Sequence, residues 1–494
     1  MHMPATMRLS PEDRAFFAPV GRAIFMNPFS EEREAVLGRV SAGHVGEAAS
    51  LDPRAYAFVT EVNQRLDRLD RHGRATLQHF DERDRGIMQP VLLYQVYHRY
   101  VPQLDALIHD QLRTAGAGSA VEFADALIAE IRKRGFSEEQ SLRYFAIFYQ
   151  LRRAFFFILG SMVGDSPSMR ELRRVLWNSV FTHDMRNYDR GLWNRMEDFS
   201  TLLFGETGTG KGSAAAAIGR SGLVAFDARR GRFAANFSQI FVAINLSQFP
   251  ESLIESELFG HKKGAFTGAI SDHAGLFELC DEHGSLFLDE IGELGIPIQI
   301  KLLQVLQERT FTPLGSHDIK RFGGRVIAAT NRPLSELRGS GEFRDDFFYR
   351  LCSDVIVMPS LRQRIEESPS ELEQLVRLLV TRTAGEDRPE LVDLVQETLR
   401  RDLPPRYPWP GNVRELEQAV RRVLLTGRYK GDLEQRSSHP ADGLARDVRS
   451  GALDARELLE GYCRMLYEQT RNYEEVARRT GLDRRTIRKY VHAG

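Results

Sequence analysis

A glycine-rich stretch ending in lysine stands at residues 205–211, where the sequence is Gly-Glu-Thr-Gly-Thr-Gly-Lys. It follows a short apolar run, Thr201–Phe204, and precedes an alanine-rich stretch typical of a helix. Glycines let backbone N–H groups converge on phosphate oxygens, and the N-terminus of the helix favours their negative charge. The sequence therefore predicts a phosphate-binding loop in which Lys211 reaches the terminal phosphates of a nucleotide.

One position in this loop departs from the general pattern. The predicted nucleotide-binding residues of the loop are Gly205, Glu206, Thr207, Gly208, Thr209, Gly210, Lys211, Gly212 and Ser213. Loops of this kind carry Ser or Thr after the lysine, where the hydroxyl helps to bind magnesium. Gly212 occupies that position here, and the sequence leaves open whether Ser213 takes the role.

Two carboxylates end a second apolar run, Leu286–Leu288, as Asp289 and Glu290. We expect Asp289 to bind Mg²⁺ and Glu290 to polarise an attacking water. Many strands end in acidic residues, so this pair is informative only together with Lys211. The two motifs together predict hydrolysis of ATP with Mg²⁺.

The length and composition indicate the number of domains and the class of protein. A chain of 494 residues is too long for one core and suggests about three domains. Its 42% hydrophobic and 27% charged residues are typical of a soluble globular protein, and its net charge is only −1. From Arg471 onward, seven Lys/Arg face three Asp/Glu, so this segment carries a local charge of +4. Such an excess predicts nucleic-acid binding at this end of the chain.

The cysteines and the apolar stretches indicate the compartment. Cys280, Cys352 and Cys463 lie far apart with no CxxC pair, which argues against a zinc site or a disulfide framework. The most apolar stretch, Ala154–Leu159, has six residues, whereas a membrane helix needs about twenty. The N-terminus lacks the pattern of a signal peptide. We therefore expect a cytoplasmic protein without a membrane partner.

The pattern of apolar and polar residues divides the chain into five segments. Residues 1–160 are predicted to be helical, with a capping box at Ser137 and Gln140. Between residues 161 and 360, helical patterns alternate with short apolar runs, which are Thr201–Phe204, Phe241–Ile244, Leu286–Leu288, Arg325–Ala329 and Val355–Met358. This alternation predicts an α/β fold, a parallel sheet with helices on both faces. Residues 361–427 are expected to be helical, 428–452 a linker, and 453–494 helical again.

Six aromatic residues stand between Phe145 and Phe157 in the N-terminal segment. They admit two interpretations, a ligand pocket or a buried helical core or dimer face. Aromatic residues near helical spacing serve packing first, so the second interpretation is favoured.

A hexapeptide carries the most specific signal. It consists of Gly264, Ala265, Phe266, Thr267, Gly268 and Ala269, and follows Glu-Leu-Phe-Gly-His at residues 257–261. Flanking glycines allow a mobile loop to present an aromatic ring and a hydroxyl to a partner. This segment resembles the GAFTGA loop of the sigma-54-dependent activators, the bacterial enhancer-binding proteins.

The resemblance extends from about Gly164 to Gly427 and resumes in the tail. It implies an AAA+ P-loop parallel sheet with a helical lid, flanked by an α-helical regulatory domain and a C-terminal helix-turn-helix. It also implies the function. Proteins of this family bind upstream enhancer DNA and use ATP hydrolysis to convert the closed complex of the sigma-54 RNA polymerase holoenzyme into an open complex.

Further site residues follow from the same resemblance. Asn245 matches the family's switch residue, which links Glu290 to the moving loop. Asn331, in Ala-Thr-Asn, matches the sensor of the terminal phosphate, and Arg414 matches the second sensor. The resemblance implies that Arg344 and Arg350 are arginine fingers that reach the nucleotide of the next subunit. The active form would then be a homo-oligomer, from dimer to hexameric ring.

In the tail, residues 473–479 predict a short helix, Gly481 a turn and residues 483–491 a second helix with Asp483 as N-cap. Val476, Leu482, Ile487 and Val491 are the expected core. The residues expected to face DNA are Arg484, Arg485, Thr486, Arg488 and Lys489. The pattern is similar to the Fis-type helix-turn-helix of the same family.

The sequence also departs from the family. The stretches 167–205 and 211–245 are longer than usual, although neither interrupts a predicted catalytic position. Two alternatives remain open: another AAA+ remodelling protein, and a DNA-binding repressor with an inactive ATPase domain. The first has no use for the 264–269 loop, and only Gly212 supports the second.

Overall fold

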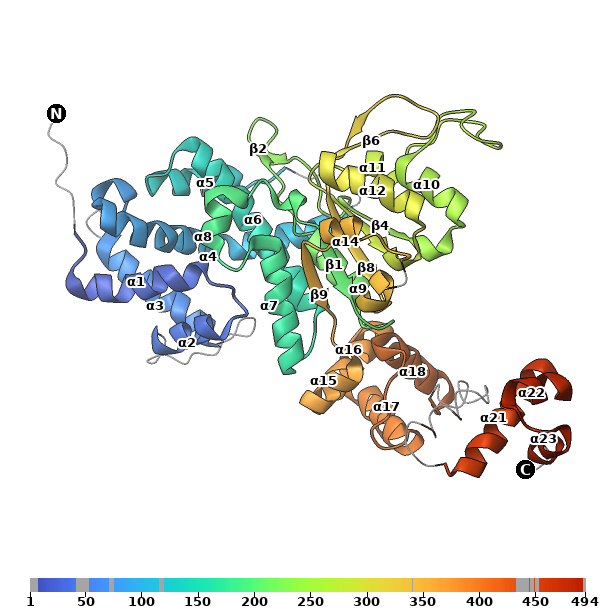
Figure 1. Cartoon of the computed structure of the whole chain (residues 1–494). Coiled ribbons are helices and arrows are strands. Elements are labelled where there is room, and N and C mark those ends of the chain that lie inside the picture. Colours follow the sequence, from blue (N-terminus) through green and yellow to red (C-terminus); the bar gives the residue numbers. More distant parts are fainter. Residues whose placement is uncertain are drawn as a thin grey trace. The chain divides into compact units, whose positions relative to one another are not determined.

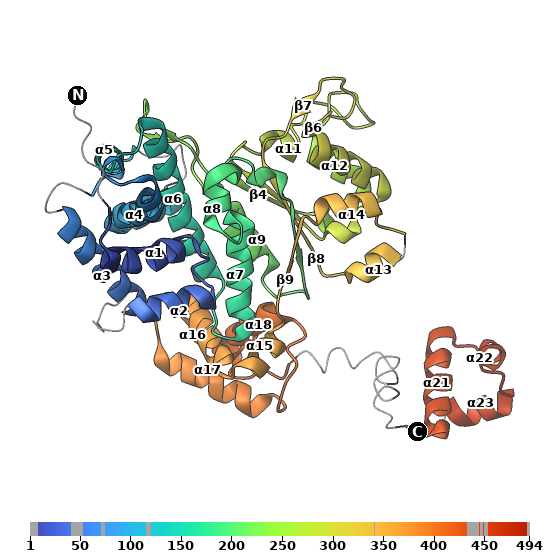
Figure 2. The ribbon, with the colours of Figure 1, turned by 60° about the vertical axis from the view of Figure 1, so that its left-hand side comes forward.

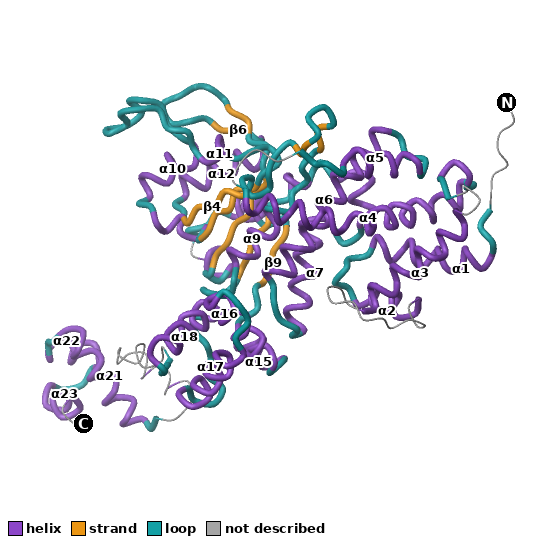
Figure 3. Tube along the Cα trace, turned by 180° about the vertical axis from the view of Figure 1, so that it is seen from behind, coloured by secondary structure: helices purple, strands orange, loops and turns teal. Residues whose placement is uncertain are grey.

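The computed structural model describes residues 8–40, 53–70, 75–114, 120–339, 341–431, 444, 448 and 453–491. These fall into two compact units, residues 1–375 with 411–414 and residues 376–410 with 415–494. Helices make up most of the described chain (Figure 3). Most of the linker predicted at 428–452 lies outside the described residues. In the described ranges no helix is long and apolar enough to cross a membrane.

A five-stranded sheet lies at the centre of the first unit, with the order β4-β5-β8-β1-β9 and parallel pairing throughout (Figure 1). Its strands are β1 (Thr201–Phe204), β4 (Phe241–Asn245), β5 (Ser285–Asp289), β8 (Arg325–Thr330) and β9 (Asp354–Val357). All five apolar runs predicted to be strands are found, each within one residue at either end. The predicted parallel α/β fold is thus confirmed.

The register of the strands brings the chemically active residues together. Asn245 pairs with Asp289 across β4 and β5, and Phe204 pairs with Thr330 across β1 and β8. In a parallel sheet the carboxyl ends of all strands lie at one edge. The segments that follow β1, β4, β5 and β8 therefore start from the same edge of the sheet.

Helices and short strands connect and cover this sheet. The helices are α9 (Lys211–Gly219), α10 (Glu251–Phe259), α11 (Leu276–Leu279), α12 (Ile296–Glu308), α13 (Leu334–Gly339), α14 (Asp345–Leu351) and α15 (Leu361–Glu367). Short 3₁₀ turns η4 (Leu246–Gln248) and η5 (Ile291–Glu293) follow β4 and β5. Two antiparallel hairpins project from the connections, β2 (Phe226–Asp227) with β3 (Arg232–Phe233), and β6 (Thr310–Phe311) with β7 (Lys320–Arg321).

The N-terminal region is helical, as predicted. Its elements are α1 (Pro11–Phe25), α2 (Glu31–Val40), α3 (Pro53–Asp70), η1 (Leu77–His79), α4 (Glu82–Arg113), α5 (Ala124–Lys133), α6 (Glu138–Ser161), α7 (Pro167–Phe181), α8 (Met185–Asn187), η2 (Tyr188–Leu192) and η3 (Met196–Asp198). The predicted capping box starts α6: Ser137 Oγ accepts from Gln140 N, and Gln140 Oε1 accepts from Ser137 N. Gly135, at φ 98°, follows the end of α5 in a conformation that favours glycine.

The aromatic residues of α6 serve packing on one face of the helix. Tyr149 stacks on Phe233 with ring centroids 4.0 Å apart, and Phe145 lies 4.8 Å from Phe226. Both partners belong to the β2–β3 hairpin, which lies within the unusually long 211–245 stretch. This stretch therefore gives α6 an apolar surface, and a single buried core extends from Leu9 to Met358.

The same face of α6 joins the end of α9, and the two helices lie side by side (Figure 2). The buried Arg153 guanidinium donates to the carbonyls of Arg220 (2.8 Å) and Gly222 (2.7 Å). Gln150 Nε2 donates to the carbonyl of Ser221 (2.9 Å). These carbonyls follow the last turn of α9, where a cation is favoured by the helix dipole. Thus α6 caps the helix that begins at the predicted phosphate loop.

The second unit is helical. It contains most of α16 (Ser370–Ala384) and α18 (Asn412–Thr426), together with α17 (Pro389–Asp402), α21 (Ala455–Thr470), α22 (Tyr473–Thr480) and α23 (Arg484–Val491). The predicted pair of tail helices is confirmed, with Gly481 at φ 72° between them. Val476 and Ile487 are fully buried in their core, and Leu482 and Val491 pack against it.

Arg325, at the start of β8, is a buried cation that links the sheet to α7. Its guanidinium donates to the carbonyls of Phe199 (2.9 Å) and Ser179 (2.8 Å) and to the Ser179 and Thr201 hydroxyls. Burial lowers its pKa to about 10, so the group remains charged near neutral pH. One side chain thereby satisfies polar groups from three segments.

We predict that Arg325→Met lowers the free energy of unfolding by about 2–4 kcal/mol, because several buried acceptors lose their donor. Urea unfolding of the variant measures this loss. Arg321→Met on β7 is the matched control, since Arg321 is exposed. Equal stability of the two variants would contradict the role assigned to Arg325.

Candidate functional site

The predicted phosphate loop connects β1 to α9. Gly210 precedes the helix at φ 98°, and Lys211 is its first residue. The Lys211 side chain is buried within the loop, where Nζ donates to the carbonyls of Gly205 (2.7 Å) and Glu206 (3.2 Å). Burial lowers the pKa of Lys211, and the nearby Glu290 and Asp289 carboxylates oppose that shift. The loop thus surrounds a cation at the N-terminus of a helix, an arrangement suited to an anion.

The segment 411–414 holds the loop from outside. Val413 N donates to the carbonyl of Gly208 (3.0 Å), and Asn412 Nδ2 donates to the carbonyl of Thr207 (3.0 Å). Gly208 has φ 81°, and a Cβ there would lie 2.1 Å from the carbonyl oxygen of Gly411. Only glycine fits at this position.

A charged clamp fixes the first half of the loop. Arg362, on α15, forms a two-fold ion pair with Glu206, and one of the contacts measures 2.9 Å. Asn412 Nδ2 donates to the same carboxylate (3.1 Å). The Arg362 hydrogen bonds lower the pKa of Glu206. Neither partner was predicted from the sequence: Asn412 lies in the 409–416 stretch that carries the predicted second sensor Arg414, whereas no local pattern identifies Arg362.

The two carboxylates after β5 differ in their surroundings. Glu290 has left-handed backbone angles, φ 58° and ψ 48°, which are uncommon for a residue other than glycine. Burial raises its pKa, and the charge of Lys211 partly opposes this. A carboxylate with a raised pKa is better suited to accept a proton from water. Asp289 is half-buried, and its Oδ2 accepts a hydrogen bond from Asn245 Nδ2 (3.5 Å).

The predicted sensors lie at the same edge of the sheet. Asn331, directly after β8, donates from Nδ2 to Thr207 Oγ1 of the loop (3.0 Å). Asn245 contacts Asp289, and its Oδ1 accepts from the backbone N–H (3.0 Å) and the hydroxyl (2.7 Å) of Ser247. The structure therefore links Asn245 to Asp289, while the predicted link to Glu290 stays a prediction. The charge of Arg414 acts on Lys211 and lowers its pKa.

The donor set at this edge fits a magnesium ion held mainly through a nucleotide. Mg²⁺ usually binds one or two carboxylates together with substrate phosphates. Asp289 supplies such a carboxylate, and the described residues contain no group of three or more His, Cys, Asp or Glu that could bind a metal alone. Gly212 is exposed with open space beside it, and Ser213 is exposed on the next position of α9. The role of Ser213 stays open.

The two predicted finger residues make contacts within their own chain. Arg344 pairs with Asp346 (2.6 Å) and keeps 39% of its side chain exposed. Arg350 donates from Nε and Nη2 to the carbonyl of Leu306 (2.9 and 2.8 Å). Their reach into a neighbouring subunit stays a prediction.

The 264–269 loop is closed by its own backbone. Gly264 N donates to the carbonyl of Ala269 (2.8 Å), and Ala269 N donates to that of Phe266 (3.0 Å). Phe266 remains 38% exposed, with its ring 4.9 Å from that of His261, and Thr267 is exposed. The loop therefore presents an aromatic ring and a hydroxyl on its surface.

In the tail, α23 carries the predicted basic surface. Asp483 caps the helix, since its Oδ1 accepts from the backbone N–H groups of Arg485 (2.9 Å) and Thr486 (3.0 Å). Hydrogen bonds from Thr486 lower the pKa of Asp483. The exposed residues of the helix are Arg484, Arg485, Arg488 and Lys489, and Thr486 is half-buried.

Comparison with known proteins decides the family. The Sigma-54 interaction domain model matches residues 186–357. The transcriptional regulatory protein ZraR of Klebsiella oxytoca is 37% identical over 332 residues, which cover 66% of this chain and 67% of ZraR. The chain belongs to the sigma-54-dependent activators.

Other activators match over less of their length. The DNA-binding transcriptional regulator NtrC of Azospirillum brasilense is 40% identical over 262 residues, covering 53% of this chain and 47% of NtrC. The chain thus spans about half to two thirds of the length of these curated relatives. Among solved structures, NtrX from Brucella abortus is similar at 20% identity and a TM-score of 0.41, covering 81% of this chain and 85% of that one.

We predict that Gly208→Ala weakens nucleotide binding at least about tenfold. The added Cβ would meet the Gly411 carbonyl and force the loop away from segment 411–414. Titration with a fluorescent ATP analogue measures the affinity. Gly86→Ala, in α4 and outside the loop, is the control, because nothing lies within 4 Å of a Cβ there. Wild-type affinity in Gly208→Ala would contradict the fit described for this loop.

Proposed function

We propose that this activator binds ATP at residues 205–213, hydrolyses it in an oligomeric ring, and remodels the sigma-54 RNA polymerase closed complex into an open complex. One observation carries the proposal. Lys211, Asp289, Glu290 and Asn331 lie at one edge of a parallel sheet, in a chain whose sigma-54 interaction domain also presents the exposed 264–269 loop.

In the proposed reaction, Lys211 and the backbone N–H groups of the loop hold the phosphates of ATP. Glu290 accepts a proton from the attacking water, which its raised pKa favours. Asn331, anchored on Thr207, orients the terminal phosphate, and Arg414 adds positive charge beside Lys211. Asp289 would hold Mg²⁺, which neutralises developing charge on the phosphates.

The proposed ring supplies Arg344 and Arg350 to the neighbouring subunit. A planar guanidinium delivered from another chain stabilises the charge of the transition state. In the structure Arg344 pairs with Asp346, and Arg350 donates to the carbonyl of Leu306. In the proposed ring both guanidinium groups exchange these contacts for phosphate oxygens of the neighbouring nucleotide.

The 264–269 loop is proposed to contact sigma-54. It contains no acid, base or metal ligand, so it has no part in the chemistry of ATP. Asn245, which contacts Asp289, lies on the strand before η4 and α10, and α10 leads to the loop. Through this connection the nucleotide selects between two positions of the loop.

The remaining segments have proposed roles of their own. We assign residues 1–160 to regulation, 161–360 to the ATPase core, 361–427 to the helical lid and 453–494 to a Fis-type helix-turn-helix. The last binds enhancer DNA through α23, whose arginines are exposed while Ile487 is buried. Residues 428–452 link the lid to this domain.

We predict that Glu290→Gln reduces ATP hydrolysis at least a hundredfold but leaves ATP binding intact, because the amide cannot accept a proton. The variant should then retain sigma-54 on a pull-down with ATP and release it with ADP. Steady-state phosphate release and the pull-down measure the two effects.

Glu293→Gln is the matched control, an exposed carboxylate three residues further on. Lys211→Ala should lose ATP binding altogether. Wild-type hydrolysis by Glu290→Gln would refute the assigned base. If the wild-type chain hydrolyses ATP but shows no ATP-dependent retention of sigma-54, another AAA+ remodelling protein is favoured. If the wild-type chain hydrolyses no ATP, a DNA-binding repressor is favoured.

A further inference from the structure

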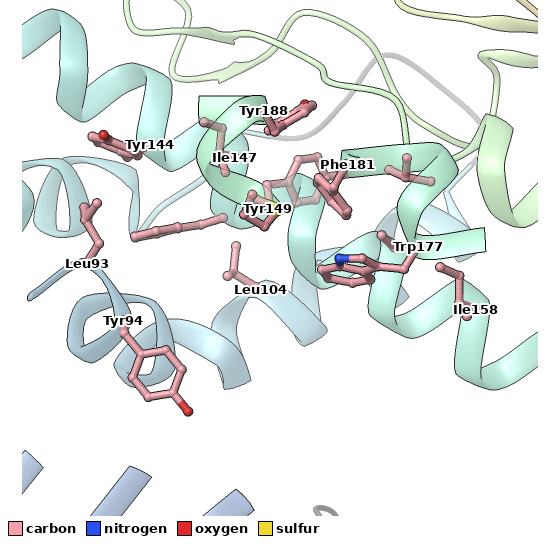
Figure 4. Close-up of a cluster of buried hydrophobic side chains, with 14 of the residues drawn as sticks. Leu93, Tyr94, Leu104, Tyr144, Ile147, Tyr149, Ile158, Trp177, Phe181 and Tyr188 are labelled. Carbon is pink, nitrogen blue, oxygen red and sulfur yellow. The ribbon is translucent and has the colours of Figure 1, made fainter. Parts of the chain in front are cut away.

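A cavity of about 190 Å³ lies inside the N-terminal helices. Its walls come mainly from α1, α2, α3, α4, α6 and α7, and eight of its 22 lining residues are Phe, Tyr or Trp. Figure 4 shows Tyr94, Ile147 and Trp177, which line it from α4, α6 and α7. The aromatic stretch of α6 is therefore divided: Phe148 and Phe155 line the cavity, whereas Phe145 and Tyr149 pack on the β2–β3 hairpin.

The wall carries an unsatisfied hydrogen-bond donor. Trp177 is only 5% exposed, and its indole Nε1–H has no acceptor in the described part of the chain. Buried donors are nearly always paired, since leaving one unpaired costs about 1–3 kcal/mol. A donor in the wall of a cavity is suited to an oxygen atom of a bound molecule.

The charges at the cavity do not cancel. Arg152 pairs with Asp105 (2.8 Å for one of two contacts), and Asp189 pairs with Arg143 (3.0 Å). Arg33, on α2, also lines the cavity but has no carboxylate partner within the described ranges.

His98 does not change this balance of charge. It lines the same cavity, and burial, together with the charges of Arg33 and Arg152, lowers its pKa to about 3. His98 is therefore neutral near pH 7, and one unpaired positive charge remains beside an aromatic cavity.

We propose that this cavity binds a small aromatic carboxylate, whose ring contacts the aromatic walls and whose carboxylate pairs with Arg33 while the Trp177 indole donates to an oxygen. An apolar cavity of about 150 Å³ accommodates benzene, so the volume here suits one ring with a short substituent. A carboxylate supplies both the charge that Arg33 requires and the acceptor that Trp177 requires.

Helix α6 connects the cavity to α9 of the proposed ATPase core. Leu151 and Phe155 of α6 line the cavity, whereas Gln150 and Arg153 on the other face hold the carbonyls that end α9. A ligand that moves or stiffens α6 therefore acts on the helix whose first residue is Lys211. This proposal concerns binding to the N-terminal helices and does not depend on sigma-54.

Calorimetric titration of the full chain with benzoate and with phenylacetate tests the proposal at pH 7. We expect saturable binding with one site per chain, and at least about tenfold weaker binding of benzamide, the neutral analogue of benzoate. Arg33→Gln should weaken benzoate binding at least about tenfold, and Trp177→Phe about threefold to tenfold. Arg39→Gln, on the same helix but outside the cavity, should bind as the wild type does.

Three results would overturn the proposal: no saturable binding of either acid, unchanged affinity in Arg33→Gln, or tighter binding of phenol or benzamide than of benzoate. Hydrogen exchange with saturating benzoate tests the route to the ATPase. Slower exchange in residues 216–222 at the end of α9 supports it, and unchanged exchange there contradicts it. Neither measurement requires ATP hydrolysis, so failure here is distinct from failure of the proposed function.

Discussion

The proposed nucleotide site depends on one constraint, that the backbone N–H groups of residues 205–211 converge on a single anion. The loop cannot maintain this shape alone, because glycines leave it conformationally free. The sheet fixes its ends, the 411–414 segment bonds to Gly208 and Thr207, and Arg362 holds Glu206. Segment 411–414, which contains the predicted second sensor Arg414, thus belongs to the framework that shapes the loop.

The helix that follows the loop connects this site to the N-terminal region. At its N-terminus α9 presents Lys211, and the carbonyls that directly follow its C-terminus accept hydrogen bonds from Arg153 and Gln150. The helix has nine residues, so its two ends are about 14 Å apart. The β2–β3 hairpin secures this joint by packing Phe233 on Tyr149. A long insertion in the ATPase sequence thereby becomes the contact surface for α6.

The sequence predicted most of the strands and helices but few of the long-range side-chain contacts that hold them together. Buried parallel strands form continuous apolar runs, so all five were identifiable, and the Ser137 capping box and Gly481 turn follow from local chemistry. Arg362, Arg325 and Arg153 could not be predicted, because their partners lie far away in the chain. The α6 aromatics show the same limit: helical spacing indicated packing, but only the tertiary structure separates the packed face from the cavity face.

The central claim is that ATP hydrolysis at the sheet edge reaches sigma-54 through the 264–269 loop. Thr267→Ala tests it most directly, because Thr267 is exposed in a loop with no group for nucleotide chemistry. ATP turnover, ring formation by size-exclusion chromatography and open-complex formation on one sigma-54 promoter are measured with the same preparation. The account predicts wild-type turnover and normal rings with no open complexes. Normal open complexes from Thr267→Ala would contradict it.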